Sequence, residues 1–244
     1  NTSKCSISAL ARSMSIAYKP TSRRLGIIAA IISRSQHAHV RRLGTPAPHI
    51  GELTMPELPE VETLVRRLRE PVIGRTIINA AVKWPRTIGR PAPKEFVRQV
   101  RGYTIASINR RAKYLVFELA QRPSTPLRSA QDAPAQPPLF LLIHLKMSGK
   151  LSVVNSDAPI LKHDRVIFDL DNGQQLRFND IRKFGRMHLV PDVADITGAH
   201  GPEPLDRAFT LPLFRDLIKA RSGSIKPLLL NQRFLSGVGN IYAD

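Results

Sequence analysis

Apolar residues near position 60 repeat at the spacing of a helix with one buried face. They fall at i, i+3, i+4 and i+7, and they are Val61, Leu64, Val65 and Leu68. This spacing predicts a helix over residues 57–69. Pro59 suits the first turn of such a helix, and Pro71 and Gly74 are expected to end it.

Between residues 76 and 178 the pattern changes to short stretches with strand character. These predicted strands cover 76–82, 103–108, 114–119, 139–145, 165–170 and 175–178. Asp171-Asn172-Gly173 separates the last two and is a strong hairpin signal. Residues 121–138 are rich in Pro, Ala and Ser, so we expect them to form a surface loop inserted between two strands.

The pattern becomes helical again in the last quarter of the chain. Leu213 and Leu217, together with Ile218, are expected to form one helix face. Pro227 lies early in a second predicted helix, which contains residues 228–230.

The chain is therefore predicted to have an α+β fold. An N-terminal helix and a two-layer β-sandwich would occupy residues 55–192, and a helical domain would occupy 200–244. Within the helical domain, residues 236–240 form a predicted tight glycine turn, and residues 241–243 begin a further element.

The composition favours a polyanionic partner. The chain carries 37 Lys and Arg against 19 Asp and Glu, a formal net charge of +18, and nucleic acid is the commonest partner of such a charge. Its single cysteine, Cys5, allows no internal disulfide and no cysteine-rich metal site. The longest apolar run of the N-terminal region, residues 26–32, is too short to cross a bilayer, so no membrane partner is expected.

The N-terminal region differs in composition from the rest of the chain. Residues 1–51 contain eight Lys or Arg and no Asp or Glu, whereas acidic residues are frequent from Met55 onward. Acid-poor, Ser- and Arg-rich segments are typical of targeting peptides. In-frame upstream sequence, translated from a wrong start, would look the same, and we favour that interpretation. Residues 1–54 are expected to be a disordered leader.

The segment MPELPEVETLVRRL, which begins at Met55, contains candidate catalytic groups. Removal of an initiator methionine would leave Pro56 as a secondary amine, and with a pKa of about 8 a fraction of it is unprotonated at neutral pH. Such an amine could attack a sugar C1′ atom to give an iminium intermediate, while Glu57 could move protons. The alternative is structural: a proline-rich helix entry with Glu60 and Glu62 at the positive end of the helix dipole.

Separated motifs along the chain resemble one known family. They are MPELPEVET (55–63), RRAKYL (110–115), HLKMSGKL (144–151), KHD (162–164), NDIRKFG (179–185), GPEPL (201–205) and IKPLLLNQRFLSGVGNIYAD (225–244). In this order they resemble the formamidopyrimidine-DNA glycosylases. The resemblance covers residues 55–244 apart from the predicted loop 121–138. It implies that the helical domain is an incomplete helix–two-turn–helix DNA-binding domain.

The resemblance implies three catalytic residues. Pro56 matches the N-terminal nucleophile of the family, Glu57 its proton donor, and Lys113 the lysine that serves the β-elimination step. Without the resemblance, Lys113 would be interpreted as a strand lysine that faces solvent.

The resemblance also implies DNA contacts in the β-rich domain. His144 and His163 match DNA-contacting histidines, and Met147, Arg182 and Phe184 resemble three residues that fill the gap left by a displaced base. An enzyme that acts on a base must take it out of the stack, and apolar wedges with an arginine can hold the duplex open. By composition alone, Met147 and Phe184 would be ordinary core residues.

In the helical domain the resemblance implies that Arg221, Lys226 and Asn240 contact DNA. The glycine turn before Asn240 would let backbone amides and the Asn240 side chain approach a phosphate closely, because glycine has no Cβ atom. For Arg221 the alternative is an ordinary exposed charge.

The implied function is base-excision repair by a bifunctional glycosylase and abasic-site lyase. It would remove 8-oxoguanine or formamidopyrimidines from double-stranded DNA and nick the strand by β,δ-elimination. A monomer in the bacterial cytoplasm, associated with the nucleoid, is expected. The chain lacks the four cysteines of the family's zinc finger, so no zinc is expected here and one structural zinc in a full-length member.

Two alternatives remain open. The related endonuclease VIII-like branch removes oxidised pyrimidines, although EVET after PELP favours the purine branch. A catalytically silent DNA-binding fragment is the other, because Pro56 is an amide without a free lone pair while residues 1–55 stay attached. The mature N-terminus distinguishes enzyme from binder.

Overall fold

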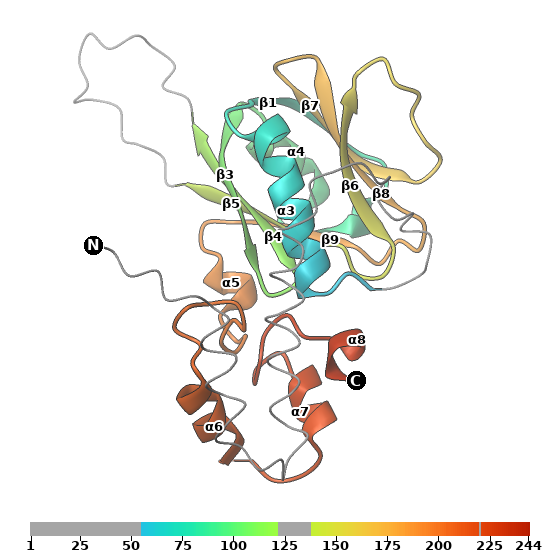
Figure 1. Ribbon diagram of the computed structural model, residues 1–244. Coiled ribbons are helices and arrows are strands. Elements are labelled where there is room, and N and C mark those ends of the chain that lie inside the picture. Colours follow the sequence, from blue (N-terminus) through green and yellow to red (C-terminus); the bar gives the residue numbers. More distant parts are fainter. Residues whose placement is uncertain (1–54, 122–137, 220) are drawn as a thin grey trace, which may run out of the picture. The chain divides into compact units, whose positions relative to one another are not determined.

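The computed structural model describes residues 55–121, 138–219 and 221–244 (Figure 1). The predicted leader 1–54, and the predicted loop 121–138 apart from its two end residues, lie outside the described residues.

The predicted N-terminal helix is α3 (Leu58–Val72), which continues beyond residue 69. Pro71 lies inside its last turn and does not end it. Ile73 caps the C-terminal end of the helix, and its backbone N–H donates to the Arg69 carbonyl at 3.1 Å. Proline removes a helical hydrogen bond and crowds the carbonyl four residues before it, but complete burial of Val72 favours the extra turn.

The strands form two sheets. The four-stranded sheet has the order β1-β7-β8-β6, and the five-stranded sheet has the order β2-β9-β5-β4-β3. In sequence order the strands are β1 (Ile77–Val82), β2 (Ile88–Arg90), β3 (Tyr103–Arg111), β4 (Tyr114–Gln121), β5 (Leu139–His144), β6 (Gly149–Asn155), β7 (Asp164–Leu170), β8 (Gln174–Asp180) and β9 (Arg186–Val190). All pairs are antiparallel except β2 with β9. The α+β class and the two-layer sheet arrangement are confirmed.

One hydrophobic core joins the two sheets and two helices. It contains Val61 and Val65 from α3, Phe96 from α4 (Pro93–Val100), and buried residues of both sheets such as Phe117 and Phe168. Figure 1 shows α3 and α4 beside these sheets. The predicted Asp171-Asn172-Gly173 turn joins β7 and β8, and Gly173 takes the left-handed φ of 76° that such a turn requires.

The last part of the chain is helical, as predicted. It contains α6 (Leu211–Lys219), α7 (Ile225–Leu230) and the short α8 (Asn240–Ala243), after a short α5 (Ala194–Thr197) that follows β9. The predicted apolar face of α6 was wrong at one position, because Leu217 and Ile218 are half-buried on the same face as the buried Phe214. Phe214 is the buried residue of α6, where its ring is 6.4 Å from Phe234, whereas Leu213 is 39% exposed. The larger aromatic ring covers more apolar area in this small core.

None of the helices described is long and apolar enough to cross a membrane.

Candidate active site

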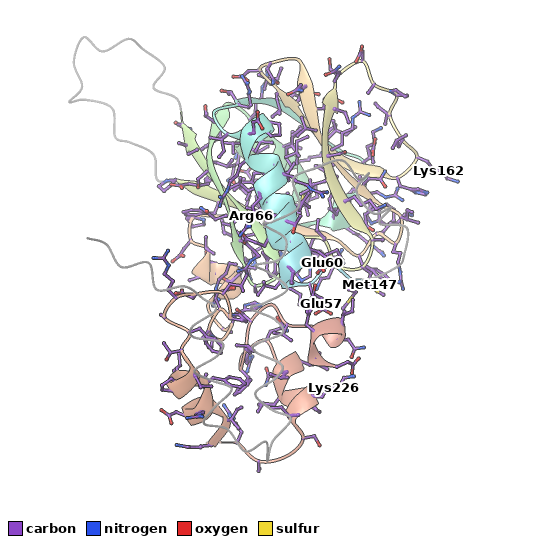
Figure 2. The ribbon with its side chains drawn as sticks, in the orientation of Figure 1. Glu57, Glu60, Arg66, Met147, Lys162 and Lys226 are labelled. Atoms are coloured by element: carbon purple, nitrogen blue, oxygen red, sulfur yellow. The ribbon has the colours of Figure 1, made fainter. Side chains whose placement is uncertain are left out.

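The Glu57 carboxylate is buried where α3 meets the glycine turn before α8. Its two oxygens accept the backbone N–H groups of Gly239 and Ile241, at 2.7 and 2.9 Å. Next to it, the Leu58 N–H donates to the Gly237 carbonyl at 3.1 Å. Figure 2 shows Glu57 at the N-terminal end of α3. Residues far apart in sequence therefore hold this carboxylate in one orientation.

The glycine turn is closed by Gln232. Its side-chain amide donates to the Val238 carbonyl at 2.7 Å and accepts the Gly237 N–H at 2.9 Å. We expected backbone amides of this turn to approach a phosphate. The amide of Gly239 donates to Glu57 instead, as does the amide of Ile241 at the start of α8.

Gly239 provides the space in which two candidate catalytic groups meet. A Cβ atom on Gly239 would lie 2.4 Å from Glu57 Oε1 and 2.5 Å from Lys113 Nζ. The carboxylate and the ammonium therefore approach the same point of the backbone, and no larger residue fits between them.

Lys113 lies in the tight turn between β3 and β4, not in a strand facing solvent as its sequence alone suggested. Ala112 before it has a φ of 52°, in the left-handed region. Burial lowers the pKa of Lys113, the Glu57 charge opposes this, and Lys146 lowers it further. A lysine with a lowered pKa has more neutral amine at neutral pH, which suits proton transfer or attack on carbon.

Glu203 holds the Lys113 turn against the GPEPL segment. Its carboxylate accepts the Ala112 N–H and pairs with Arg110 at 2.6 Å and Arg111 at 2.9 Å. Burial acts to raise the pKa of Glu203, but Arg110 and these hydrogen bonds outweigh it and lower the pKa. Arg110 also pairs with Glu62 of α3 at 3.1 Å. This ion network fixes the backbone on which Lys113 is carried.

His144 ends β5 close to Lys113. Its Nδ1 accepts the Lys146 backbone N–H at 2.9 Å, which leaves the proton on Nε2 in the neutral ring. The centre of its ring lies 4.7 Å from the centre of the Tyr114 ring, and the two rings are nearly perpendicular. Burial, with Lys146 and Lys113 nearby, lowers the pKa of His144 to about 3. His144 is therefore a neutral Nε2–H donor at physiological pH.

This protonation state can be measured directly. The His144 ring is expected to stay neutral, with an Nε2–H tautomer, between pH 8 and pH 5 in nitrogen-detected NMR. Its pKa is lower folded than unfolded, so protonation favours unfolding. The neutral His144 ring therefore contributes stability that is fully present above about pH 6.5, its unfolded pKa. This contribution is lost as the pH falls toward about 3, its folded pKa. Between these two values the free energy of unfolding should fall less for His144→Gln than for wild type. A titration midpoint near the unfolded value would contradict the expectation.

Three other predicted DNA-contacting residues of the sandwich lie on two turns joined by Asp180. Met147 lies on the turn between β5 and β6, and Arg182 and Phe184 lie on the 181–184 loop between β8 and β9. The Asp180 carboxylate accepts the Ser148 hydroxyl from the first turn. It also accepts the backbone N–H groups of Arg182 and Gly185, at 3.2 and 2.8 Å.

The 181–184 loop presents an exposed apolar and cationic surface. Phe184 is 48% exposed and Ile181 is 61% exposed. The Arg182 guanidinium lies 5.1 Å from the centre of the Phe184 ring. The interpretation of Phe184 as an ordinary core residue does not hold, because a core residue would be buried.

Replacement of Asp180 by asparagine is expected to destabilise both turns. The carboxamide has one acceptor oxygen, so its NH₂ group faces a backbone N–H or the Ser148 hydroxyl. A buried donor left unsatisfied costs about 1–3 kcal/mol, and the free energy of unfolding in urea should fall by that amount. Asp157→Asn, at an exposed position, is the control and should change little. Equal stability of the two variants would show that Asp180 does not hold the turns.

The remaining predicted site residues are more scattered. His163 Nδ1 accepts a hydrogen bond from Arg165 at 3.0 Å, and its carbonyl accepts the Asp180 N–H. Pro56 is half-buried directly before Glu57. Three others lie on the helical part: Arg221 is exposed between α6 and α7, Lys226 pairs with the Asp244 side chain, and Asn240 is exposed at the start of α8.

Sequence reasoning assigned no role to Asp180, Glu203 or Gln232. Each lies inside a motif that carried the family resemblance, so the signal was present. Their partners, however, are separated from them by a fold that the motifs do not reveal. Among the residues described, no group of three or more His, Cys, Asp or Glu could hold a metal ion.

Comparison with known proteins supports the resemblance. Residues 55–187 match the formamidopyrimidine-DNA glycosylase N-terminal domain, and residues 200–244 match the H2TH domain of the same enzymes. The formamidopyrimidine-DNA glycosylase of Protochlamydia amoebophila is 44% identical over 191 residues, which are 78% of this chain and 63% of that protein.

Solved structures agree. One is the complex between the Lactococcus lactis enzyme Fpg and DNA that contains an abasic site, with a TM-score of 0.65 and 34% identity. That match covers 78% of this chain and 65% of the other. MutM in complex with DNA containing carbocyclic 8-oxo-G gives a TM-score of 0.64 and 33% identity, over 77% of this chain and 65% of the other. The chain thus spans less than two thirds of the length of these relatives. It belongs to the formamidopyrimidine-DNA glycosylase family.

Proposed function

We propose that this chain carries the catalytic groups of a bifunctional DNA glycosylase and abasic-site lyase that removes oxidised purines from double-stranded DNA. The observation that carries the proposal is the buried Glu57 carboxylate. Two backbone amides hold it beside Lys113, and it directly follows Pro56. Relatives bound to abasic-site DNA and to 8-oxo-G-containing DNA support the substrate class.

The reaction begins at Pro56, whose nitrogen must be free. The secondary amine attacks C1′ of the damaged nucleotide, the bond from C1′ to the base breaks, and the base leaves with its bonding electrons. The Pro56 nitrogen loses its proton, which the departing base takes up. Glu57 donates a proton to the ring oxygen O4′ as the C1′–O4′ bond breaks, and the product is an iminium ion between Pro56 and C1′.

Strand cleavage then needs a base. Loss of a C2′ proton from the iminium expels the 3′ phosphate by β-elimination, and a second elimination expels the 5′ phosphate. Lys113, whose pKa is lowered by burial, is the candidate for accepting that proton.

Binding of the duplex rests on positive charge and on Met147, Arg182 and Phe184, here called the wedge residues. Residues 55–244 carry 29 Lys and Arg against 18 Asp and Glu, a net charge of +11. Met147, Arg182 and Phe184 would enter the space left by the everted nucleotide. Because phosphate contacts release counterions, affinity should fall steeply as salt rises.

A bacterial cytoplasmic location close to the nucleoid is part of the proposal. The relatives are bacterial proteins, and the proposed substrate is DNA. A monomer is proposed, because one chain supplies Pro56, Glu57 and Lys113.

Borohydride trapping on a duplex with 8-oxoguanine opposite cytosine tests the proposal. Protein that begins at Pro56, after removal of Met55, should form a covalent adduct that maps to Pro56, and the chain that retains residues 1–55 should not. Pro56→Gly, which keeps a terminal primary amine, is the control for the proline itself. DNA binding without an adduct in any sample would favour a silent DNA-binding protein.

A further inference from the structure

Lys183 is the central residue of the 181–184 loop and contacts the face of Trp84. Its Nζ lies 4.1 Å from the centre of the indole ring. Its backbone has a φ of 62°, a left-handed conformation that lysine rarely adopts. Contacts outside the loop must favour this conformation over the ordinary ones. The Trp84 ring is such a contact, and Arg182 and Phe184 are the immediate neighbours of Lys183.

Trp84 is held firmly by its backbone. The N–H groups of Lys83 and Trp84 both donate to the Arg165 carbonyl, at 2.8 and 3.4 Å. The indole Nε1 is buried and has no hydrogen-bond partner within the described ranges. Burial of an unpaired N–H is unfavourable. The contact that Trp84 makes with Lys183 is therefore through its ring face and not through its N–H group.

Arg165, whose carbonyl accepts the Trp84 N–H, also binds Asp180, the residue directly before the 181–184 loop. The Arg165 side chain donates to the Asp180 carbonyl at 2.8 Å and to His163 Nδ1 at 3.0 Å. Asp180 in turn accepts the Arg182 N–H. Trp84 and the 181–184 loop are thus both attached to Arg165 of β7, which limits their relative movement.

We propose that Trp84 is a positioning residue for insertion into damaged DNA. Its ring holds the Lys183 ammonium, and this contact keeps the left-handed turn that points Arg182 and Phe184 outward from the sandwich. Trp84 itself touches neither the lesion nor the reacting atoms. The proposal rests on the proposed function, because it gives a source for the preorganised wedge that an everted base requires.

The expected effect on binding follows from the strength of a cation–π contact. Loss of such a contact corresponds to about a three- to tenfold change in an equilibrium constant. The change should appear with a duplex that contains a tetrahydrofuran abasic analogue, because there the wedge enters the duplex. It should not appear with undamaged duplex, which is bound through phosphates.

Trp84 is the only tryptophan of the chain, so its fluorescence reports this contact directly. The variants are Trp84→Leu, Trp84→Phe, Lys183→Met and Lys183→Arg, with Lys94→Met at an exposed position as the matched control. Lys183→Met should change the Trp84 emission, while Lys183→Arg and Lys94→Met should leave it close to wild type. Trp84→Leu and Lys183→Met should each weaken binding to the abasic duplex three- to tenfold, without changing binding to undamaged duplex.

Rescue by the conservative variants separates positioning from general destabilisation. Trp84→Phe keeps an aromatic face and should stay within about twofold of wild type. The double variant Trp84→Leu with Lys183→Met should be no worse than either single variant, because both remove one contact. If Trp84→Leu does not fold, the two Lys183 variants still test the contact.

Other results would overturn the proposal. They are an unchanged emission in Lys183→Met, equal losses on damaged and undamaged duplex, or additive losses in the double variant. If wild-type protein does not prefer the abasic duplex, the proposed function fails instead. In that case the emission of Lys183→Met still decides whether the Trp84 ring holds Lys183.

Discussion

Replacement of Glu57 by glutamine is expected to lower the rate of base excision by about two to four orders of magnitude. The variant loses the group that donates a proton to the opening sugar. Its NH₂ group would also face the N–H of Gly239 or of Ile241, which the carboxylate now accepts. Single-turnover excision on a duplex with 8-oxoguanine opposite cytosine, with protein that begins at Pro56, measures the effect.

Glu70→Gln is the matched control for this change. Glu70 lies on the same helix and is exposed to solvent. Its replacement should leave the excision rate unchanged. Binding of the Glu57 variant to an abasic-analogue duplex should persist, since the phosphate contacts and the wedge residues remain. An excision rate within about threefold of wild type would remove Glu57 from the proton-transfer step.

Replacement of Gly239 by alanine is expected to lower excision about 100-fold and to destabilise the fold by about 1–3 kcal/mol. The new methyl group would lie 2.4 Å from Glu57 Oε1 and 2.5 Å from Lys113 Nζ. Both groups would have to move, and displacement of a catalytic group by about 1 Å is enough for such a loss. Excision kinetics and urea unfolding on the same protein measure the two effects.

A second glycine variant, Gly223→Ala, distinguishes crowding of Glu57 and Lys113 from the general effect of replacing a glycine. At Gly223 a Cβ atom would meet nothing within 4 Å, although its φ of 103° makes any substitution strained. Gly223→Ala should therefore lower stability but leave the excision rate of the folded protein unchanged. Equal losses of excision in the two variants would mean that Gly239 acts through backbone strain. Its own φ of −132° argues against that explanation.

Local pattern was sufficient for many of the elements. The helical repeat at Val61 and Val65 predicted α3, and strands with continuous apolar runs, such as β4 and β5, were found close to their predicted ranges. The strands β2, β6 and β9 were not predicted. In β6 the buried residues alternate with exposed ones only over residues 149–152. The short helix α4 was not predicted either.

The sequence by itself determined the identity of the chemical groups. The order of the motifs around Pro56, Lys113 and Asn240 identified the family, because a motif preserves residue type and local spacing. The sequence also determined the strong positive charge. Neither property depends on how distant segments meet.

Only the tertiary structure decided how those groups are held and used. Glu57 and Gly239 are 182 residues apart, yet the amide of one donates to the carboxylate of the other. Lys113 was expected in a solvent-facing strand, but in the fold it lies in a half-buried turn that Glu203 holds. Burial and hydrogen bonding set the charge state and orientation of a group. Both depend on neighbours that are distant in sequence, and so no local pattern could reveal them.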